Sequence, residues 1–254
     1  MFEERLLAVI ASPLIFAGLA ALVFMPLEAL FPLRMQRPRS LRTDVLFATA
    51  GAILTRGLLF LLALLLVVLT YELDAGPLAG LPSVVQVVLG LAYFELAGYG
   101  YHRLAHRSAF LFRFHRVHHT STTMDWLAGF RQHPVEILLM TAVQNVPLVL
   151  QGLPLGQHIL VVLAHRLNTL VVHANLRTPR WLGWFIATPS FHHRHHATQG
   201  PVANFATLFP FIDRLFHTHR ADEAKAVGLG DTGDEGFMEL LVAPVRPEKS
   251  PVRG

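Results

Sequence analysis

Two histidine clusters with the same internal spacing constrain this chain more than any other feature of its sequence. The segment from Tyr101 to Glu136 contains six histidines, including the run HRVHH, and the run PSFHHRHH repeats the HxxHH spacing downstream. Imidazole is the usual protein ligand for zinc, copper, iron and nickel. If both clusters serve one metal site, the fold must bring together segments that are far apart in the sequence.

Within each cluster, the spacing places several imidazole rings on one face of a helix. His102 and His106 are four residues apart, so on a helix they lie one turn above each other. The HxxHH runs place their histidines at i, i+3 and i+4, and these are His115, His118, His119, His192, His195 and His196. The side chain of His193 should point elsewhere. A single histidine is more often a helix-end cation, a core residue or a surface group, but this combination of runs predicts a metal site.

Composition places the site in a membrane protein. The chain is 53% hydrophobic and 15% charged, and its mean hydropathy of +0.45 is too high for an ordinary soluble fold. It has no cysteine, which excludes disulfides, thiolate zinc sites and iron–sulfur clusters. Any metal must therefore be bound by nitrogen and oxygen ligands.

Apolar stretches predict membrane-spanning helices. Leu6 to Met25 is long enough to cross a bilayer, and no small-residue cleavage site follows it, so we interpret it as a retained span rather than a signal peptide. The second stretch, Val45 to Tyr71, contains Arg56, which can snorkel, form a pair or face the bundle interior. A third runs from Ser83 to Gly100. The first two are joined by a loop whose arginines place it on the cytoplasmic side, namely Arg34, Arg37, Arg39 and Arg42.

The chain after the first histidine cluster predicts an apolar hairpin. Residues 135–150 and 157–172 are apolar and flank the uncharged turn QGLPLG, so the hairpin should enter and leave the membrane on the same side. His158 and His165 in its second arm are better explained by packing or hydrogen bonding than by ligation. His173, at the end of that arm, is a better ligand candidate. The aromatic-rich segment NFATLFPFIDRLFHTHR can pack or lie at the membrane interface.

The order of these motifs resembles that in the fatty acid hydroxylase and sterol desaturase superfamily. The shared runs are HRLAH, HRVHH, RQHPVE, HAN, TPSFHHRHH and DRLFHT, and the resemblance as a whole covers residues 34–220. Two positions depart from the family pattern. Glu95 stands where an aspartate is common, and His217 stands where DxxFGT has glycine. The resemblance implies that the metal ligands are His102, His106, His115, His118, His119, His173, His192, His195 and His196, with His133 as a further candidate.

The resemblance implies an all-α fold, a polytopic membrane helical bundle of about four to five membrane-embedded helices. A cytoplasmic helical cap would hold the histidine-rich di-metal site. We expect residues 1–33 to form the first span, residues 34–220 the membrane-embedded core, and residues 221–254 a polar, partly disordered tail. The location would be a bacterial inner membrane, with the chain crossing it several times and the metal site on the cytoplasmic side.

The resemblance also implies a lipid hydroxylase or desaturase, an oxidoreductase that uses O2 and two iron ions, for which zinc can substitute in a purified sample. About nine imidazoles exceed what a closed four-coordinate zinc site uses, which agrees with two metals. Electrons would come from a separate carrier such as a cytochrome, ferredoxin or reductase, and no catalytic residue beyond the ligands is indicated. A histidine-rich metal transporter and a zinc-dependent membrane enzyme are the alternatives. The arginines follow the loops, so the basic pI does not indicate nucleic acid.

Overall fold

The computed structural model describes residues 13–36, 41–70, 76–229 and 235–246. Regular structure in these residues is helical, apart from two isolated β-bridges, which confirms the predicted all-α class. The elements in chain order are α2 (Pro13–Leu30), α3 (Arg42–Leu46), the π-helical η1 (Phe47–Gly51), α4 (Ala52–Thr70), α5 (Ser83–Arg107), α6 (Ala109–His119), η2 (Trp126–Phe130), α7 (Pro134–Leu150), α8 (Leu155–His173), η3 (Arg180–Trp184), α9 (Pro189–His195), α10 (Phe211–Leu215), α11 (Phe237–Val242) and η4 (Ala243–Val245).

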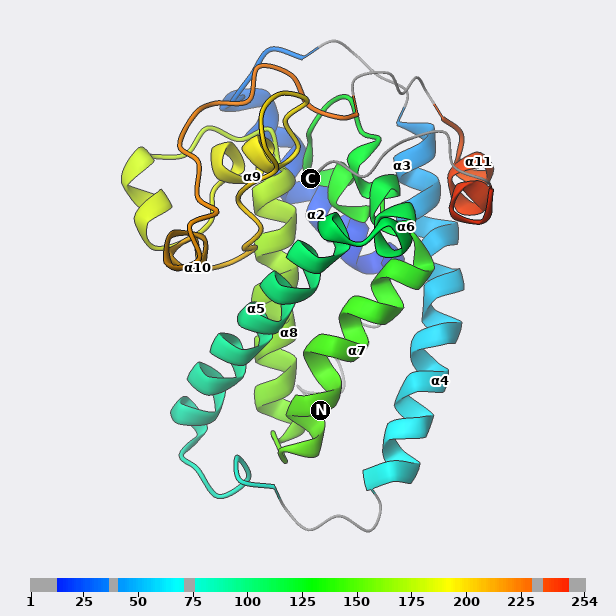
Figure 1. The fold of residues 1–254 in the computed structure, drawn as a ribbon, viewed down its shortest axis with the longest axis vertical. Coiled ribbons are helices and arrows are strands. Elements are labelled where there is room, and N and C mark those ends of the chain that lie inside the picture. The colour runs from blue at the N-terminus through cyan, green and yellow to red at the C-terminus, as the bar shows by residue number, and fades with distance from the viewer. Residues whose placement is uncertain (1–12, 37–40, 71–75, 230–234, 247–254) are drawn as a thin grey trace.

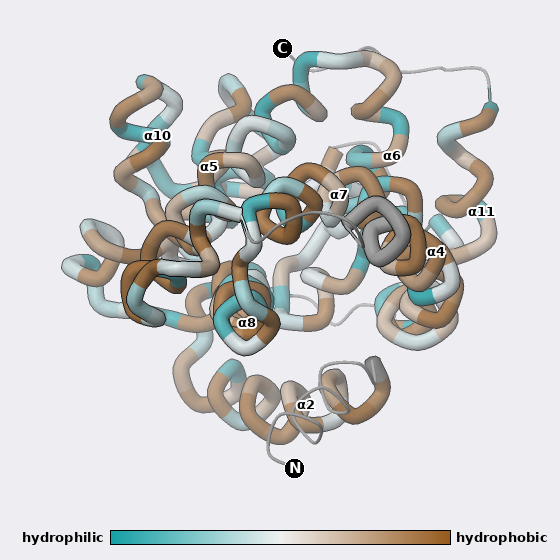
Figure 2. The backbone as a smooth tube through the Cα atoms, turned by 90° about the horizontal axis from the view of Figure 1, so that it is seen from below, coloured by the Kyte–Doolittle hydropathy of each residue, from teal (hydrophilic) through white to brown (hydrophobic). Residues whose placement is uncertain are grey.

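Among the residues that the structure describes, three helical stretches are long and apolar enough to cross a membrane. They are Arg42–Leu65, Ser83–Arg107 and Leu155–His173, and two shorter apolar helices, Leu14–Leu30 and Pro134–Leu150, accompany them. Figure 1 shows α4, α5, α7 and α8 as long helices below a cap that contains α6, α9 and α10. In Figure 2, seen from the end opposite the cap, α2 lies on one side of α8 and α4, and most of its residues are hydrophobic. The predicted helical bundle with a helical cap is therefore confirmed, and three of its helices are suited to a membrane by length and composition.

The predicted apolar hairpin is formed by α7 and α8. Its turn contains Gly152, whose φ of 74° lies in the left-handed region that favours glycine. A Cβ on Gly152 would also meet the backbone nitrogen of Gly76 at 2.6 Å. The Leu78 backbone N–H donates to the Gln151 carbonyl over 3.0 Å, which ties the turn to the loop that precedes α5. Opposite this turn, α7 begins at Pro134 and α8 ends at His173, so the hairpin starts and ends at the cap, where both histidine clusters lie.

Two predicted spans have different ends in the structure. The stretch predicted to end at Gly100 continues as α5 to Arg107, so HRLAH forms the last turns of a long apolar helix. The first predicted span, Leu6 to Met25, lies partly outside the described residues, and α2 continues past Met25 to Leu30. Near its end, a carboxylate oxygen of Glu28 accepts the backbone N–H groups of Trp126 and Asn175, each over 2.8 Å. This end of α2 is therefore attached to the cap.

Part of the segment expected to be a polar tail packs against the protein. Phe237 and Leu240 of α11 form a core cluster with Phe47 and Val117. Phe237 and Phe47 meet edge to face, with ring centroids 4.8 Å apart. Arg116 and Glu235 add an ion pair at 3.4 Å. Residues 235–246 therefore pack against η1 and α6, while residues 230–234 and 247–254 lie outside the described residues.

Candidate metal centre

Nine histidines converge inside the cap from four helices. The last turns of α5 carry His102 and His106, and the end of α8 carries His173. The two HxxHH runs lie on α6 and at the end of α9. Each of the nine side chains is at most 6% exposed. The structure thus brings together all nine residues that the family resemblance indicated as ligands.

The nine rings form two groups, which we call the five-histidine group and the four-histidine group. In each group one nitrogen per ring lies within 4.8 Å of the others. Neighbouring Nε2 atoms are 3.0–3.2 Å apart in both groups. The five-histidine group contains His102, His106, His115, His119 and His195, and the four-histidine group contains His118, His173, His192 and His196.

Helical geometry explains how each HxxHH run is divided between the groups. Residues i and i+4 lie about 40° apart around a helix, whereas i+3 lies about 60° away on the other side of i. Accordingly, His115 and His119 enter the five-histidine group, and His118 enters the other. The second run shows the same division with the groups exchanged, because its i+3 member, His195, joins the five-histidine group. Each run therefore contributes to both groups.

In five of the rings, the hydrogen bonds of Nδ1 leave Nε2 as the nitrogen that can bind a cation. Five of the nine place Nδ1 against an oxygen acceptor at 2.6–3.1 Å. Four of these acceptors are backbone carbonyls, which only accept, so each of those Nδ1 atoms carries the proton. The corresponding Nε2 atoms then direct lone pairs at one another across about 3 Å, an arrangement that a bound metal ion would stabilise. The donor set of buried, neutral imidazoles suits iron and zinc alike.

A buried carboxylate orients one member of the five-histidine group. Glu136 is 2% exposed and accepts from His115 Nδ1 over 3.0 Å and from the Tyr101 hydroxyl over 2.9 Å. Such carboxylate–histidine pairs fix the ring orientation and raise the basicity of the ligating nitrogen. Glu136 lies in the RQHPVE segment, but its spacing alone did not reveal this role.

A loop after α9 supplies two further acceptors. The carbonyls of Phe205 and Ala203 accept from His102 Nδ1 over 2.7 Å and from His195 Nδ1 over 2.8 Å. Asp213 holds this loop because its carboxylate accepts the backbone N–H groups of Phe205 and Ala206 over 2.9 and 2.8 Å. Burial raises the pKa of Asp213 above its ordinary value, and these hydrogen bonds oppose that shift. Asp213 therefore helps to position His102 and His195 through the backbone of this loop.

A buried ion pair supports the four-histidine group. Arg131 donates to the Asp44 carboxylate and to the Thr120 hydroxyl, and its backbone carbonyl accepts from His118 Nδ1 over 3.1 Å. Asp44 and Arg131 are 0% and 7% exposed. The pair thus connects α3, which contains Asp44, to the loop behind His118. No motif in the sequence indicated this pair.

Gly129 and Thr169 separate His173 from a cavity of about 510 Å³ between the long helices. The cavity is lined by residues of α2, α4, α7, α8 and η2, including Phe16, Leu59, Phe60, Met140 and Val162. A Cβ at Gly129 would lie 3.3 Å from His173 Nδ1, and the Thr169 carbonyl accepts from that same nitrogen over 2.6 Å. A molecule in this cavity therefore comes within one layer of residues of the four-histidine group.

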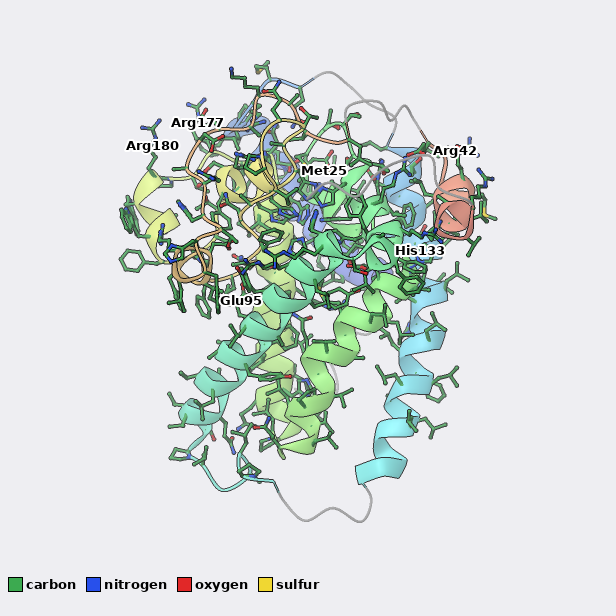
Figure 3. All side chains as sticks on the ribbon, in the orientation of Figure 1. Met25, Arg42, Glu95, His133, Arg177 and Arg180 are labelled. Atoms are coloured by element: carbon green, nitrogen blue, oxygen red, sulfur yellow. The ribbon has the colours of Figure 1, made fainter. Side chains whose placement is uncertain are left out.

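The remaining histidines lie outside both groups. His133 caps α7, accepting from the Val135 N–H over 3.1 Å and donating to the Leu241 carbonyl over 3.1 Å, and Figure 3 shows it beside α11. His158 donates to the Asn145 side chain, and His165 lies 3.7 Å from the Glu95 carboxylate. His193 donates to the His173 carbonyl over 3.1 Å, so it points away from the Nε2 groups as expected.

The two departures from the family pattern have distinct surroundings. Glu95 is 1% exposed and accepts the backbone N–H groups of Thr207, Leu208 and Phe209, so it fastens the loop before α10 to α5. His217, in the position of a family glycine, has a φ of 58°. This left-handed conformation is the one that glycine adopts without strain.

Acid should weaken both folding and metal binding. Burial, and secondarily the neighbouring imidazoles, lowers the pKa of five rings well below the ordinary 6.5, namely His118, His119, His192, His195 and His196. Below pH 6.5 the unfolded chain binds protons that the folded chain does not, so stability is greatest above that pH and falls on acidification. Each ring that stays neutral in the folded chain while it is protonated in the unfolded chain adds to this loss of stability.

We therefore expect the thermal midpoint of the metal-free protein to drop steeply between about pH 7 and pH 5. Retained metal, measured by mass spectrometry after dialysis, should fall over the same range because protonated imidazole cannot ligate. A midpoint and a metal content that stay constant across this range would contradict the neutral, buried state of the rings.

Glutamine in place of Glu136 should lower metal affinity by about 10- to 100-fold, the usual effect of losing a ligand's orienting partner. The change keeps the size of the side chain but removes the charge that faces His115 Nδ1 at 3.0 Å. Metal competition with a chelator measures the effect, and Glu239→Gln on exposed α11 is the control, since its side chain is 52% exposed. Equal affinities in the two variants would count against a role for Glu136 in orienting His115.

Comparison with known proteins agrees with this geometry. The fatty acid hydroxylase family model matches residues 87–218. Ornithine lipid hydroxylase OlsE of Rhizobium tropici is 32% identical over 171 residues, which cover 64% of this chain and 51% of that protein. Delta(7)-sterol 5(6)-desaturase ERG3B of Gibberella zeae is 26% identical over 138 residues (54% and 42%), and very-long-chain aldehyde decarbonylase GL1-10 of Oryza sativa is 25% identical over 170 residues (61% and 56%).

The chain spans about half the length of the curated relatives that it matches. No solved structure matches it. The residues matched by the family model make up more than half of the 254 and include every member of the five-histidine and four-histidine groups. The chain therefore belongs to the fatty acid hydroxylase family.

Proposed function

We propose that the chain is a membrane-bound di-iron oxygenase that hydroxylates or desaturates a lipid, using O2 and electrons from a separate carrier. The observation that carries this proposal is the pair of buried histidine groups, of which the four-histidine group lies one residue layer away from a cavity among the apolar helices. One group can hold one ion and the other a second, with His102, His106, His115, His119 and His195 around the first and His118, His173, His192 and His196 around the second. When bound, two iron ions would supply the activation of O2 that an unactivated C–H bond requires.

The chain's own residues would then hold the ligands and position the substrate. Glu136, Asp213 and the Arg131 carbonyl fix ring orientations through the contacts described above, so the site is arranged before substrate enters. The nearly complete burial of the rings keeps bulk water out. The cavity would hold the apolar part of a lipid against Phe16 and Leu59, and would bring one carbon toward Gly129 and His173.

The choice between hydroxylation and desaturation would depend on where that carbon lies. Relatives named as a hydroxylase and as a desaturase match overlapping parts of this chain, so family membership is compatible with both outcomes. A shift of about 1 Å in a bound substrate changes which bond reacts and at what rate. The product of the native protein is therefore the measurement that decides between them.

We propose that the electron carrier docks on the cap. Arg177 and Arg180 are exposed there, and Figure 3 shows both side chains at the periphery of the cap, well away from α4. A basic face of this kind would attract an acidic cytochrome, ferredoxin or reductase. Its electrostatic contribution should weaken as ionic strength rises.

We also propose that the cap lies on the cytoplasmic side of a bacterial inner membrane. The arginines in the loop before the apolar stretch that begins at Val45 agree with this orientation. Cysteines introduced at the exposed positions Thr122 and Gln199 of this cysteine-free chain should then react with an impermeant reagent from the cytoplasm. A cysteine at exposed Ser83, at the start of α5, should react from the opposite side. Labelling of Thr122 and Ser83 variants from one side would contradict the topology.

The function is tested with purified, iron-loaded protein, a reductase system and membrane lipids under ¹⁸O2. We expect two iron ions per chain and either one labelled oxygen atom in a lipid product or loss of two hydrogens without label. Lipid profiles of cells with and without the chain identify the class of lipid. Unchanged lipids together with altered metal uptake would favour the transporter, and a zinc-dependent, O2-independent reaction would favour the zinc enzyme.

A further inference from the structure

The cavity beside the four-histidine group contains two arginines from different helices. Arg56 of α4 and Arg166 of α8 both line it. Neither guanidinium has a hydrogen-bond or ion-pair partner among the residues that the structure describes. The sequence left open whether Arg56 snorkels, pairs or faces the bundle interior, and the structure places it on the wall of this open cavity, where the side chains of Arg56 and Arg166 are both exposed.

The charge of this cavity is unbalanced. Its described lining contains both arginines and no aspartate or glutamate. Glu95, a buried carboxylate on nearby α5, is not part of the lining: its Oε1 accepts the backbone N–H groups of residues 207–209, and its Oε2 lies 3.7 Å from Nε2 of the lining residue His165. Both arginines belong to helical stretches long and apolar enough to span a membrane. A charge in such a stretch is costly unless it is paired or hydrated. Two positive charges that line one cavity therefore favour the binding of an anion there.

The position of Arg166 relates that anion to the metal centre. It precedes His173 by seven residues on the same helix, which corresponds to about 10 Å along the axis. Apolar lining residues, including Leu59, Phe60 and Val162, surround the two cations. An occupant that matches this lining has an acidic group, an apolar part, and a reactive carbon about 10 Å from the acid along α8.

We propose that the substrate is an acidic lipid whose carboxylate or phosphate is bound by Arg56 and Arg166. The guanidinium group suits both anions because its planar fork donates two parallel hydrogen bonds to them. Bound there, the acid fixes the depth of the lipid in the cavity and so selects the carbon that lies beside Gly129 and His173. This inference rests on the proposed function, because it names the substrate class of the same site.

Binding of matched acidic and neutral lipids to the metal-loaded protein in an uncharged detergent tests the proposal. One arm compares radiolabelled palmitate with its methyl ester, and the other compares phosphatidylglycerol with diacylglycerol. We expect one acid to bind about 10- to 100-fold more tightly than its neutral partner, the size of a charge-assisted hydrogen bond. The arm that shows the difference identifies the acid as carboxylate or phosphate. If neither acid binds more tightly than its partner, the proposal is wrong.

Substitution of the two arginines locates the binding site. Arg56→Gln and Arg166→Gln should each remove most of the preference for the acid, and Arg56→Lys should restore part of it. Arg180→Gln on the exposed cap removes the same charge outside the cavity and should leave the preference unchanged. Thermal midpoints and metal contents establish that each variant is folded. If the variant with both glutamines keeps the native preference for the acid, the assignment of the anion site to Arg56 and Arg166 is wrong. If a variant fails to fold, the comparison of acid and ester in the native chain still tests the proposal.

A second variant separates this inference from the proposed function. His173→Ala removes a metal ligand but leaves both arginines in place, so it should lose lipid oxidation and keep the preference for the acid. If the native protein binds the acid preferentially but oxidises no lipid, the oxygenase function fails and the anion site stands. If it oxidises lipids without any preference for acids, the anion site fails and the function stands.

Discussion

Alanine in place of His173 should abolish lipid oxidation and remove about half of the bound metal. His173 belongs to the smaller of the two groups, and its Nε2 lies 3.0 Å from that of His118 and 3.1 Å from that of His192. Three imidazoles would remain, and the ring that leaves is the one that lies beside the cavity. We expect activity to fall by more than about 100-fold, the upper end of what loss of an outer partner costs.

Iron content per chain, measured by mass spectrometry, and product formation are the two readouts. His158→Ala is the matched control, because that ring hydrogen-bonds Asn145 and belongs to neither group. The control should keep both ions and the native rate. Undiminished metal in the His173 variant would show that this ring is not a ligand, whereas loss of both ions would show that the two groups bind metal cooperatively.

Alanine in place of Asp44 should destabilise the protein by about 3 to 5 kcal/mol, because it leaves the buried guanidinium of Arg131 without its counter-charge. That loss is a large part of the roughly 5 to 15 kcal/mol by which a typical domain is stable. The substitution should also affect the metal centre, since the Arg131 carbonyl accepts a hydrogen bond from His118. We expect weaker retention of the metal in the four-histidine group than in the five-histidine group.

Chemical denaturation of the purified protein in detergent measures the change in stability. Glu239→Ala is the control, because its ion pair with Arg246 is exposed and 4.0 Å long, and it should change stability by less than about 0.5 kcal/mol. A double variant, Asp44→Ala with Arg131→Met, should recover part of the loss by removing the unpaired charge. Equal stability of the native and Asp44→Ala proteins would show that the ion pair contributes nothing to folding.

The histidine spacings determined much of the local site. HxxxH on a helix fixes His102 and His106 on one face, and both are on α5 as predicted. The apolar stretches likewise predicted long helices, because the period and length of an apolar run are properties of the local chain. The order of the motifs, through the family resemblance, identified all nine histidines that the structure brings together in the two groups. These features depend on neighbours a few residues apart, so they can be inferred without a fold.

Only the tertiary structure decided how the rings are shared between the two groups. Within a run, His115 and His119 must diverge from His118, but the run does not specify which partners each will meet. Those partners come from helices far away in sequence, for example His106 and His195, which are 89 residues apart and whose Nε2 atoms are separated by 3.2 Å. The packing of α5, α6, α8 and α9 in the cap sets these distances.

The residues that orient the histidines, and the cavity beside them, could be identified only from the fold. Glu136, Asp213 and Arg131 reach the histidines across gaps of 13 to 21 residues or through a backbone carbonyl, and neither kind of contact leaves a periodic pattern. Arg56 was an isolated charge in an apolar run until α4 and α8 placed it beside the same cavity as Arg166. The sequence thus determined which side chains each helix presents, because that depends on the helical repeat. The tertiary structure determined what they face, because that depends on how distant helices bury their apolar surfaces against one another.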